Sequence, residues 1–239
     1  MSIWSEPVLT CFSAREKAVP QALLFDLDGT LIDSVPDLAA AIDQMLVQLG
    51  QAPAGETLVA EWVGNGVDML VRRALCQGND LQALALDDAD VAAAQALFDP
   101  FYLAHLNDAT GVYPGVTKTL TTLAVLGIRM ALVTNKPRAF TEVILDSLGW
   151  QPYFDAVVCG DDLPQRKPDP AQLLYACELM AVEPQQTMMV GDSRNDMYAG
   201  KAAGCVTVAV PYGYNHGENI ATCQPNLLIH SLAELIEPA

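Results

Sequence analysis

The sequence predicts an α/β protein with a doubly wound parallel sheet and a helical domain inserted after the first strand. Four short apolar runs rich in β-forming residues are each followed by a polar cluster and then by a helical pattern. This alternation is typical of a Rossmann-like sheet. From residue 35 to about residue 108 the alternation stops, and apolar residues recur at helical spacing.

The first strand is predicted at residues 22–25, and it leads directly into the sequence DLDGT at residues 26–30. Because side chains alternate along an extended segment, Asp26 and Asp28 are expected to project the same way from the strand end. Gly29 lets the chain turn and approach a ligand closely. Two such carboxylates need a raised pKa or a cation, and Mg²⁺ prefers oxygen ligands of this kind. The alternative is a plain turn that caps a helix.

A second strand is predicted at residues 130–133, and Thr134, Asn135 and Lys136 follow it. The cluster supplies a hydroxyl and an amide at another strand end. The alternative is a strand followed by an N-capped helix without a chemical role.

A third strand is predicted at residues 156–159, with a polar loop after it. In this loop Pro168 and Pro170 stiffen the chain beside Lys167. A lysine in a loop is usually just solvated, but this one could form an ion pair with the acids at the other strand ends.

The fourth strand, at residues 188–190, leads into Gly191, Asp192 and, four residues later, Asp196. An acidic turn that caps a helix is the alternative for this cluster. Ligands of open α/β sheets bind at the carboxyl ends of the strands, where all four clusters lie. Their coincidence at one edge favours joint chemistry.

The helical residues 35–108 are predicted to form a separate domain inserted into a core made of residues 21–34 and 109–239. The alternative is a helical subdomain that only adds to the core. Residues 1–20 are predicted to be a loosely held extension without a function. Within the insert, helices are expected at residues 37–49, 56–63, 67–75 and 89–106.

The chain of 239 residues has a formal net charge of −17. This charge argues against binding to nucleic acid or to an anionic membrane, because phosphate neutralisation needs basic residues. An anionic substrate would need local positive charge, and five basic residues lie in or beside the polar clusters. Two of them, Arg138 and Arg194, are expected to be ordinary surface residues. The five are Lys136, Arg138, Arg166, Lys167 and Arg194.

The six cysteines form no Cys-x-x-Cys pair, which predicts reduced packing residues in a cytoplasmic protein. The N-terminus lacks the basic start and continuous apolar core of a signal peptide. No apolar run reaches the roughly 18 residues of a membrane-spanning helix. Monomer and homodimer both remain open.

In their order, the four clusters resemble the signatures of the haloacid dehalogenase superfamily, whose members are mostly phosphatases. The resemblance spans residues 22 to about 210. It implies that Asp26 attacks phosphorus to form an aspartyl-phosphate and that Asp28 is the general acid and base. It also makes Thr134 a hydrogen-bond donor to the phosphoryl group and Lys167 a fixed positive charge beside it.

The same resemblance implies a Mg²⁺ cofactor, held by carboxylate oxygens of Asp26 and Asp192 and by the main-chain carbonyl of Asp28. Asp196 is expected one shell further out, where it would orient either a metal-bound water or Lys167. Further substrate-binding candidates in the core are Gly29, Thr30, Asn135 and Lys136.

Three shorter stretches resemble bacterial phosphoglycolate phosphatases, at residues 62–66, 72–75 and 212–218. This narrower resemblance implies hydrolysis of 2-phosphoglycolate, a small phosphorylated metabolite, beneath a mobile helical cap. Main-chain amides around Asn65 would approach the substrate carboxylate, and Arg72 or Arg73 would pair with it. The alternative for either arginine is a solvent-facing helix position.

Other functions stay open at this stage. A phosphatase of a sugar phosphate and a β-phosphoglucomutase-like phosphomutase would share the core clusters. A phospho-aspartate switch resembling a receiver domain would not need Asp28 or so large an insert. Phosphonate-cleaving relatives use a cap lysine, and the chain has none between Lys17 and Lys118. Dehalogenases manage without the second aspartate, so Asp28 argues against that branch.

Overall fold

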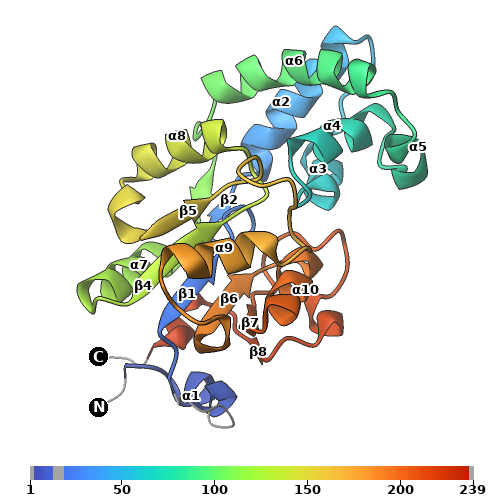
Figure 1. Ribbon diagram of the computed structural model, residues 1–239. Helices are drawn as coiled ribbons and strands as arrows, with labels where there is room; N and C mark the ends of the chain where they lie inside the picture. Colours follow the sequence, from blue (N-terminus) through green and yellow to red (C-terminus); the bar gives the residue numbers. More distant parts are fainter. Residues whose placement is uncertain (1–2, 13–18, 237–239) are drawn as a thin grey trace.

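The computed structural model describes residues 3–12 and 19–236, and a six-stranded parallel sheet lies at its centre (Figure 1). From one edge to the other the strands are β5 (Ala156–Val158), β4 (Arg129–Val133), β1 (Ala22–Phe25), β6 (Thr187–Gly191), β7 (Val206–Ala209) and β8 (Leu227–Leu228). The first strand of the chain is therefore central, with β4 and β6 as its neighbours. The predicted doubly wound α/β class is confirmed.

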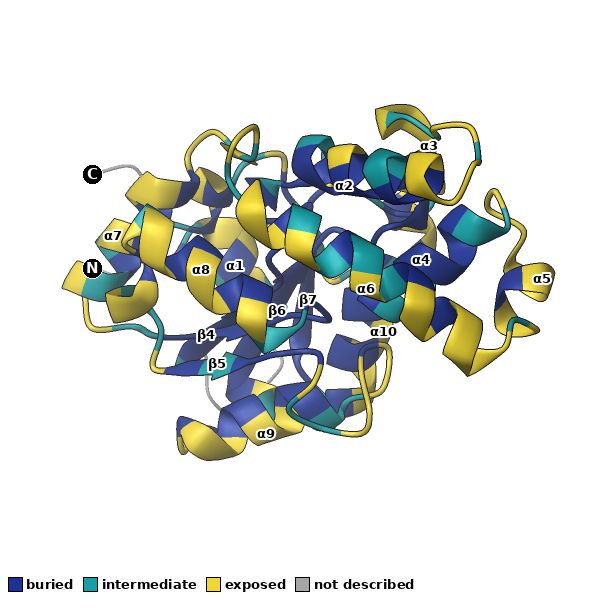
Figure 2. Cartoon of the chain, turned by 90° about the horizontal axis from the view of Figure 1, so that it is seen from above, coloured by how far each residue is buried: buried dark blue, intermediate teal, exposed yellow. Residues whose placement is uncertain are grey.

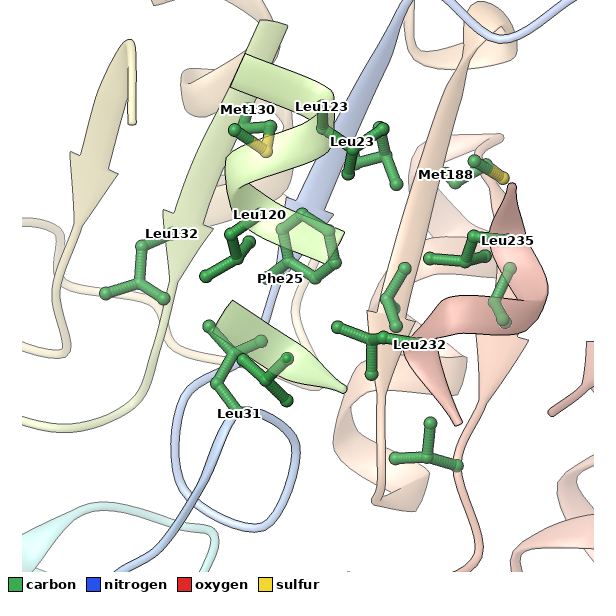
Figure 3. Packing of buried hydrophobic residues seen from close by; sticks show 14 of the residues in the cluster. Leu23, Phe25, Leu31, Leu120, Leu123, Met130, Leu132, Met188, Leu232 and Leu235 are labelled. Carbon is green, nitrogen blue, oxygen red and sulfur yellow. The ribbon is translucent and has the colours of Figure 1, made fainter. Parts of the chain in front are cut away.

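Helices cover both faces of this sheet because alternate side chains of each strand point in opposite directions. Leu23 and Phe25 of β1 belong to a core on the side of α7 and α8 (Figure 3), whereas Leu24 belongs to a second core beneath α9 and α10. The covering helices are α7 (Val116–Val125), α8 (Arg138–Leu148), α9 (Ala171–Leu179) and α10 (Arg194–Ala203). Short 3₁₀ helices are η1 (Gln151–Tyr153), η2 (Pro184–Gln186), η3 (Ile220–Cys223) and η4 (Leu232–Leu235).

The insert forms five helices above the carboxyl edge of the sheet, and they share an apolar core of their own (Figure 1). Seen from above, these helices present exposed outer faces and buried inner ones (Figure 2). They are α2 (Val35–Gln48), α3 (Glu56–Trp62), α4 (Val67–Leu75), α5 (Asp80–Leu84) and α6 (Asp88–Ala104). The sequence pattern had indicated all of these except the short α5, with ends displaced by up to two residues. We call these five helices the cap.

A two-stranded antiparallel ribbon joins the cap to the core, and the sequence analysis did not anticipate it. It pairs β2 (Ile32–Asp33) with β3 (Gly111–Val112), the two connections through which the chain leaves and re-enters the core. Asp37 at the start of α2 accepts hydrogen bonds from the main chain of Ala109 and Thr110, at 2.8 and 3.0 Å. The cap is thus held by two adjacent chain crossings.

The predicted loose extension is wrong for the part of it that the structure describes. Residues 6–12 form α1 (Glu6–Phe12), and Trp4, Val8 and Phe12 are buried in the same core as β1. Trp4 also forms a β-bridge with Ile236 near the other end of the chain. A single apolar face on so short a helix gave too weak a periodic signal to show this packing from the sequence. In the described part of the chain, no helix has the length and apolarity to cross a membrane.

We predict that Phe12→Ala destabilises the protein by about 3 to 5 kcal/mol, because it leaves a cavity beside the sheet. The matched control is Val125→Ala, whose side chain is 81% exposed, and it should change the free energy of unfolding by less than about 0.5 kcal/mol. Urea denaturation measures both values. Equal, small effects would mean that the extension contributes nothing to the core.

Candidate active site

The carboxyl ends of β1, β4 and β6 bring the predicted motif residues together. Asp26 follows β1, Thr134 follows β4, and Asp192 follows β6; all three are buried. Because the three strands are neighbours in a parallel sheet, their ends meet at one edge. The buried apolar residues of each strand determine where that strand ends. The apolar runs in the sequence therefore place the three polar residues at the sheet edge.

Lys167 lies at the centre of this cluster although it comes from the loop before α9. Its Nζ donates hydrogen bonds to Oδ1 of Asp26, to Oδ1 of Asp196 and to the carbonyl oxygen of Val133, each at 2.7 Å. Burial favours the neutral amine, but the two carboxylates outweigh it and raise the pKa of Lys167 above its ordinary value. The ammonium is a permanent charge with all three of its donors engaged.

The carboxylate of Asp26 faces opposing influences. Burial raises its pKa to about 7, against the lowering effect of Lys167 beside it, and the charges of Asp196 and Asp28 add to the rise. Burial and the charges of Asp26 and Asp196 likewise raise the pKa of Asp192 well above its ordinary value. Additional positive charge at this edge would favour the ionised form of both carboxylates.

Asp28 lies on the cavity side of the same turn and contacts another buried lysine. Nζ of Lys136 donates to both of its carboxylate oxygens, at 2.9 and 3.1 Å, and Oγ of Ser34 donates to Oδ1 at 2.5 Å. The ammonium of Lys136 also lies 5.0 Å from the ring centroid of Tyr102, a cap residue. Asp28 therefore has a fixed orientation, with its lysine partner held between core and cap.

The turn after β1 is shaped by close approach to Asp192. Gly29 has φ +86°, and a Cβ there would lie 2.3 Å from Oδ2 of Asp192, so that another residue would not fit. Thr30 donates from Oγ1 to Oδ1 of Asp192 at 2.8 Å, and the main-chain N–H of Tyr214 donates to Oδ2 at 2.6 Å. Gly29 and Thr30 were predicted to bind substrate, but the Thr30 hydroxyl positions Asp192, and Gly29 leaves room for that carboxylate.

Asn135 holds two loops in place. Its Nδ2 donates to the carbonyl oxygens of Gly64 in the cap and of Lys167, both at 3.0 Å, and its Oδ1 accepts from the N–H of Lys167 at 3.1 Å. The side chain is therefore committed to these protein groups. The prediction that the amide of Asn135 donates to a substrate would require the main-chain N–H instead.

Gln172 is a buried residue that the sequence analysis missed. Its Oε1 accepts from the N–H of Lys167 at 3.1 Å, and its Nε2 donates to the carbonyl oxygens of Thr134 and Cys159 at 3.2 and 3.0 Å. A glutamine on a helix carries no local signal for such a role. Ser34 and Tyr102 were missed as well: Ser34 contacts Asp28 from six residues further along the chain, and Tyr102 contacts Lys136 only because the cap packs on the core.

Three carboxylates form a group suited to a cation. Oxygens of Asp26, Asp192 and Asp196 lie within 4.8 Å of one another, and all three residues are buried. Asp196 is the most committed, because Oδ1 accepts from Lys167 and Oδ2 accepts from the hydroxyl and N–H of Ser193 at the start of α10. Asp192 and Asp26 keep more acceptor capacity for an ion.

A cavity of about 40 Å³ lies between these core residues and the cap. Asp26, Asp28, Thr134, Asn135 and Lys136 line its polar floor. Its cap side is apolar except for main-chain groups and is formed by Leu38, Val63, Gly66, Val67 and Leu70. The cap therefore covers the carboxylates and leaves room for a small group only.

The structure does not bring the predicted cap arginine Arg72 to this cavity. Its guanidinium donates to Asp88 and, at 2.8 Å, to Asp68, as well as to two main-chain carbonyls within the cap. Arg73 donates to Asp80 and to Oδ1 of Asn65, at 2.8 and 3.0 Å. Both arginines thus stabilise the cap internally, and Asn65 contacts Arg73 instead of lining the cavity.

Comparisons with known proteins agree with this geometry. A family model described as haloacid dehalogenase-like hydrolase matches residues 20–204. A phosphoglycolate phosphatase of Pseudomonas fluorescens is 50% identical over 225 residues, covering 92% of this chain and 82% of that protein. Phosphoglycolate phosphatase 1 of Pseudomonas aeruginosa is 47% identical over 218 residues, or 91% and 79% of the two chains. A predicted phosphoglycolate phosphatase of Haemophilus somnus, known from its crystal structure, superposes with a TM-score of 0.83 at 36% identity over 90% of this chain and 95% of that one.

We predict that Gln172→Leu destabilises the protein by roughly 3 kcal/mol, because it removes three buried hydrogen bonds to main-chain groups. Gln95→Leu is the control, since Gln95 contacts the side chain of Asp99 on its own helix and sits at the cap surface. Urea denaturation compares the two. A Gln172→Leu protein as stable as the control would show that these hydrogen bonds do not hold the lysine loop.

Proposed function

The chain belongs to the haloacid dehalogenase-like hydrolases, and from this membership we propose that it hydrolyses 2-phosphoglycolate to glycolate and phosphate. The relatives that are about half identical to it are named for that activity. Their similarity extends over more than nine-tenths of the chain, cap included, which supports the same substrate class. The chain is a phosphatase on the family evidence, and the specific ester is our proposal.

One observation supports the reaction type most directly: the buried carboxylate of Asp26 lies in the floor of the cavity beneath the cap, with Nζ of Lys167 at 2.7 Å from it. A carboxylate in this setting is a nucleophile whose far oxygen is held by a fixed cation. In-line attack on phosphorus by the other oxygen forms an aspartyl-phosphate and expels the alkoxide of glycolate. Water then attacks the phosphorus and releases phosphate.

The phosphoryl oxygens need positive partners during both displacements. Lys136 and Thr134 line the same cavity as Asp26, so the ammonium and the hydroxyl are placed to receive them. Burial of Lys136 favours its neutral form, but Asp28 and Tyr102 raise its pKa above the ordinary value, so it keeps its charge. The apolar cap surface excludes bulk water and strengthens these interactions.

Asp28 acts as the general acid and base in this scheme. It lines the cavity next to Asp26, and Ser34 and Lys136 fix its orientation. In the first displacement it donates a proton to the leaving alkoxide of glycolate. In the second it accepts a proton from the attacking water, which returns it to its starting state.

The acidic group at the strand ends fits Mg²⁺. Three buried carboxylates within 4.8 Å of one another supply hard oxygen ligands, and burial, together with the neighbouring carboxylates, raises the pKa values of Asp26 and Asp192. Asp26, Asp192 and the main-chain carbonyl of Asp28 would hold the ion, and Asp196 would act through Lys167. When bound, Mg²⁺ neutralises charge on the transferring phosphoryl group.

The small volume of the cavity, about 40 Å³, disfavours a bulky leaving group beneath the cap. A panel of small phosphorylated acids and sugars, with phosphate release measured for each, tests this directly. The proposal expects 2-phosphoglycolate to have the highest kcat/KM and to release phosphate continuously. A hexose phosphate preferred by orders of magnitude would contradict it, and isomerisation without net phosphate release would indicate a phosphomutase.

We predict that Asp26→Asn lowers kcat at least about 1,000-fold, because an amide is a poor nucleophile toward phosphorus. Asp146→Asn, at an exposed position on α8, should leave kcat unchanged. Circular dichroism of each variant establishes that it is folded. Full turnover by folded Asp26→Asn would reject the nucleophile assignment.

We also predict that Mg²⁺ at a hundredfold excess over Kd raises the melting temperature by roughly 5 to 10 °C, since ligand binding to the native state adds about 2.7 kcal/mol. Asp192→Asn should lose most of this shift, whereas Asp146→Asn should retain it. Differential scanning calorimetry measures the shift without any substrate. An unchanged shift in Asp192→Asn would place the ion elsewhere.

A further inference from the structure

The loop between α3 and α4 receives an unusual pair of hydrogen bonds from the core. We call residues 63–66 the α3–α4 loop. Its Gly64 carbonyl oxygen accepts from Nδ2 of Asn135 and from Nδ2 of Asn195, both at 3.0 Å. A carbonyl oxygen has two lone pairs, so this acceptor is saturated by two side chains of the core.

A third contact lies one turn earlier in the cap. Nδ1 of His216 lies 2.9 Å from the carbonyl oxygen of Glu61 in α3. Because a carbonyl only accepts, Nδ1 must carry the proton. The ring also adjoins the loop, since a Cβ added to Gly64 would lie 3.5 Å from its Cε1 and Nε2.

These three donors come from three different loops of the core. Asn135 follows β4, Asn195 lies in the first turn of α10 after β6, and His216 lies between β7 and η3. Together they therefore link three separate segments of the core to α3 and to the loop that follows it. Their acceptors, the carbonyls of Glu61 and Gly64, are main-chain groups fixed by the cap fold.

Hydrogen bonds within the cap also hold the α3–α4 loop in a fixed position relative to α4. Arg73 of α4 donates to the carbonyl oxygen of Trp62 at 2.8 Å and to Oδ1 of Asn65 at 3.0 Å. The loop is therefore tied to the next helix and moves with it. Val63 and Gly66 of the same loop line the cavity above Asp26.

We propose that Asn195 and His216 are positioning residues that hold the α3–α4 loop down on the active site and so restrict the reaction to small esters. This inference rests on the proposed function. Asn135 makes the same kind of contact but also binds the Lys167 loop, so its loss would mix two effects. Asn195 and His216 contact the cap without binding the Lys167 loop, so replacing them tests the cap contact alone.

Removal of either donor shifts the cap toward an open state. A neutral hydrogen bond of ordinary net strength corresponds to about a fivefold change in such an equilibrium. The closed state predominates when both donors are present, so kcat/KM for a small ester that reacts from it should change little. An aryl ester that reacts only from the minor open state should gain that factor, because the open population rises.

The experiment compares kcat/KM for 2-phosphoglycolate with kcat/KM for para-nitrophenyl phosphate in Asn195→Ala, His216→Ala and the double variant. The ratio should fall about fivefold in each single variant and about 25-fold in the double one. Asn226→Ala is the matched control, because this amide accepts two hydrogen bonds from Thr207 in the core and contacts neither the α3–α4 loop nor the two residues under test. Its ratio should equal that of the wild type.

Hydrogen exchange of the amides of residues 61–66, measured without substrate, is the second readout. It should be about fivefold faster in each single variant and unchanged in Asn226→Ala. An unchanged ratio together with unchanged exchange would overturn the proposal. If the wild type releases no phosphate from 2-phosphoglycolate, the proposed function fails, and the exchange rates still decide whether these residues hold the loop.

Discussion

The buried ammonium of Lys167 is the interaction on which the active site depends. It touches Asp26 after β1, Asp196 after β6 and the carbonyl of Val133 in β4, so one side chain joins three strand ends. Its own loop is fixed by the main-chain N–H of Lys167, which donates to Oδ1 of Asn135 and to Oε1 of Gln172. Without this cation, buried carboxylates at the sheet edge would repel one another and favour protonation.

Although the chain has a net charge of −17, two buried lysines place positive charge at the active site. Lys136 and Lys167 are buried at the site, as the proposed handling of an anionic substrate requires. The two arginines expected to be ordinary surface residues are partly exposed and form ion pairs: Arg138 with Asp162 and Glu142, and Arg194 with Glu218. Arg166 donates to the carbonyl of Gly160 at 2.5 Å and adjoins Gly66 of the cap.

The sequence was sufficient for the core because each strand end combines a buried apolar run with acids or donors at fixed spacing. It was insufficient wherever a role depends on distant chain segments meeting. Gln172 and Ser34 look ordinary in their local sequence, and Arg72 resembles a substrate ligand until its partners within the cap are known. The packing of Phe12 depends on a sheet face assembled from residues far along the chain.

The central claim is that Asp26 accepts the phosphoryl group, and trapping the intermediate tests it most directly. Borohydride added during turnover of 2-phosphoglycolate reduces an aspartyl-phosphate to homoserine, which peptide mass spectrometry locates. The account predicts substrate-dependent homoserine at position 26, with Asp28 and Asp192 unmodified. Homoserine at either of those positions, or none at position 26 while phosphate is released, would contradict it.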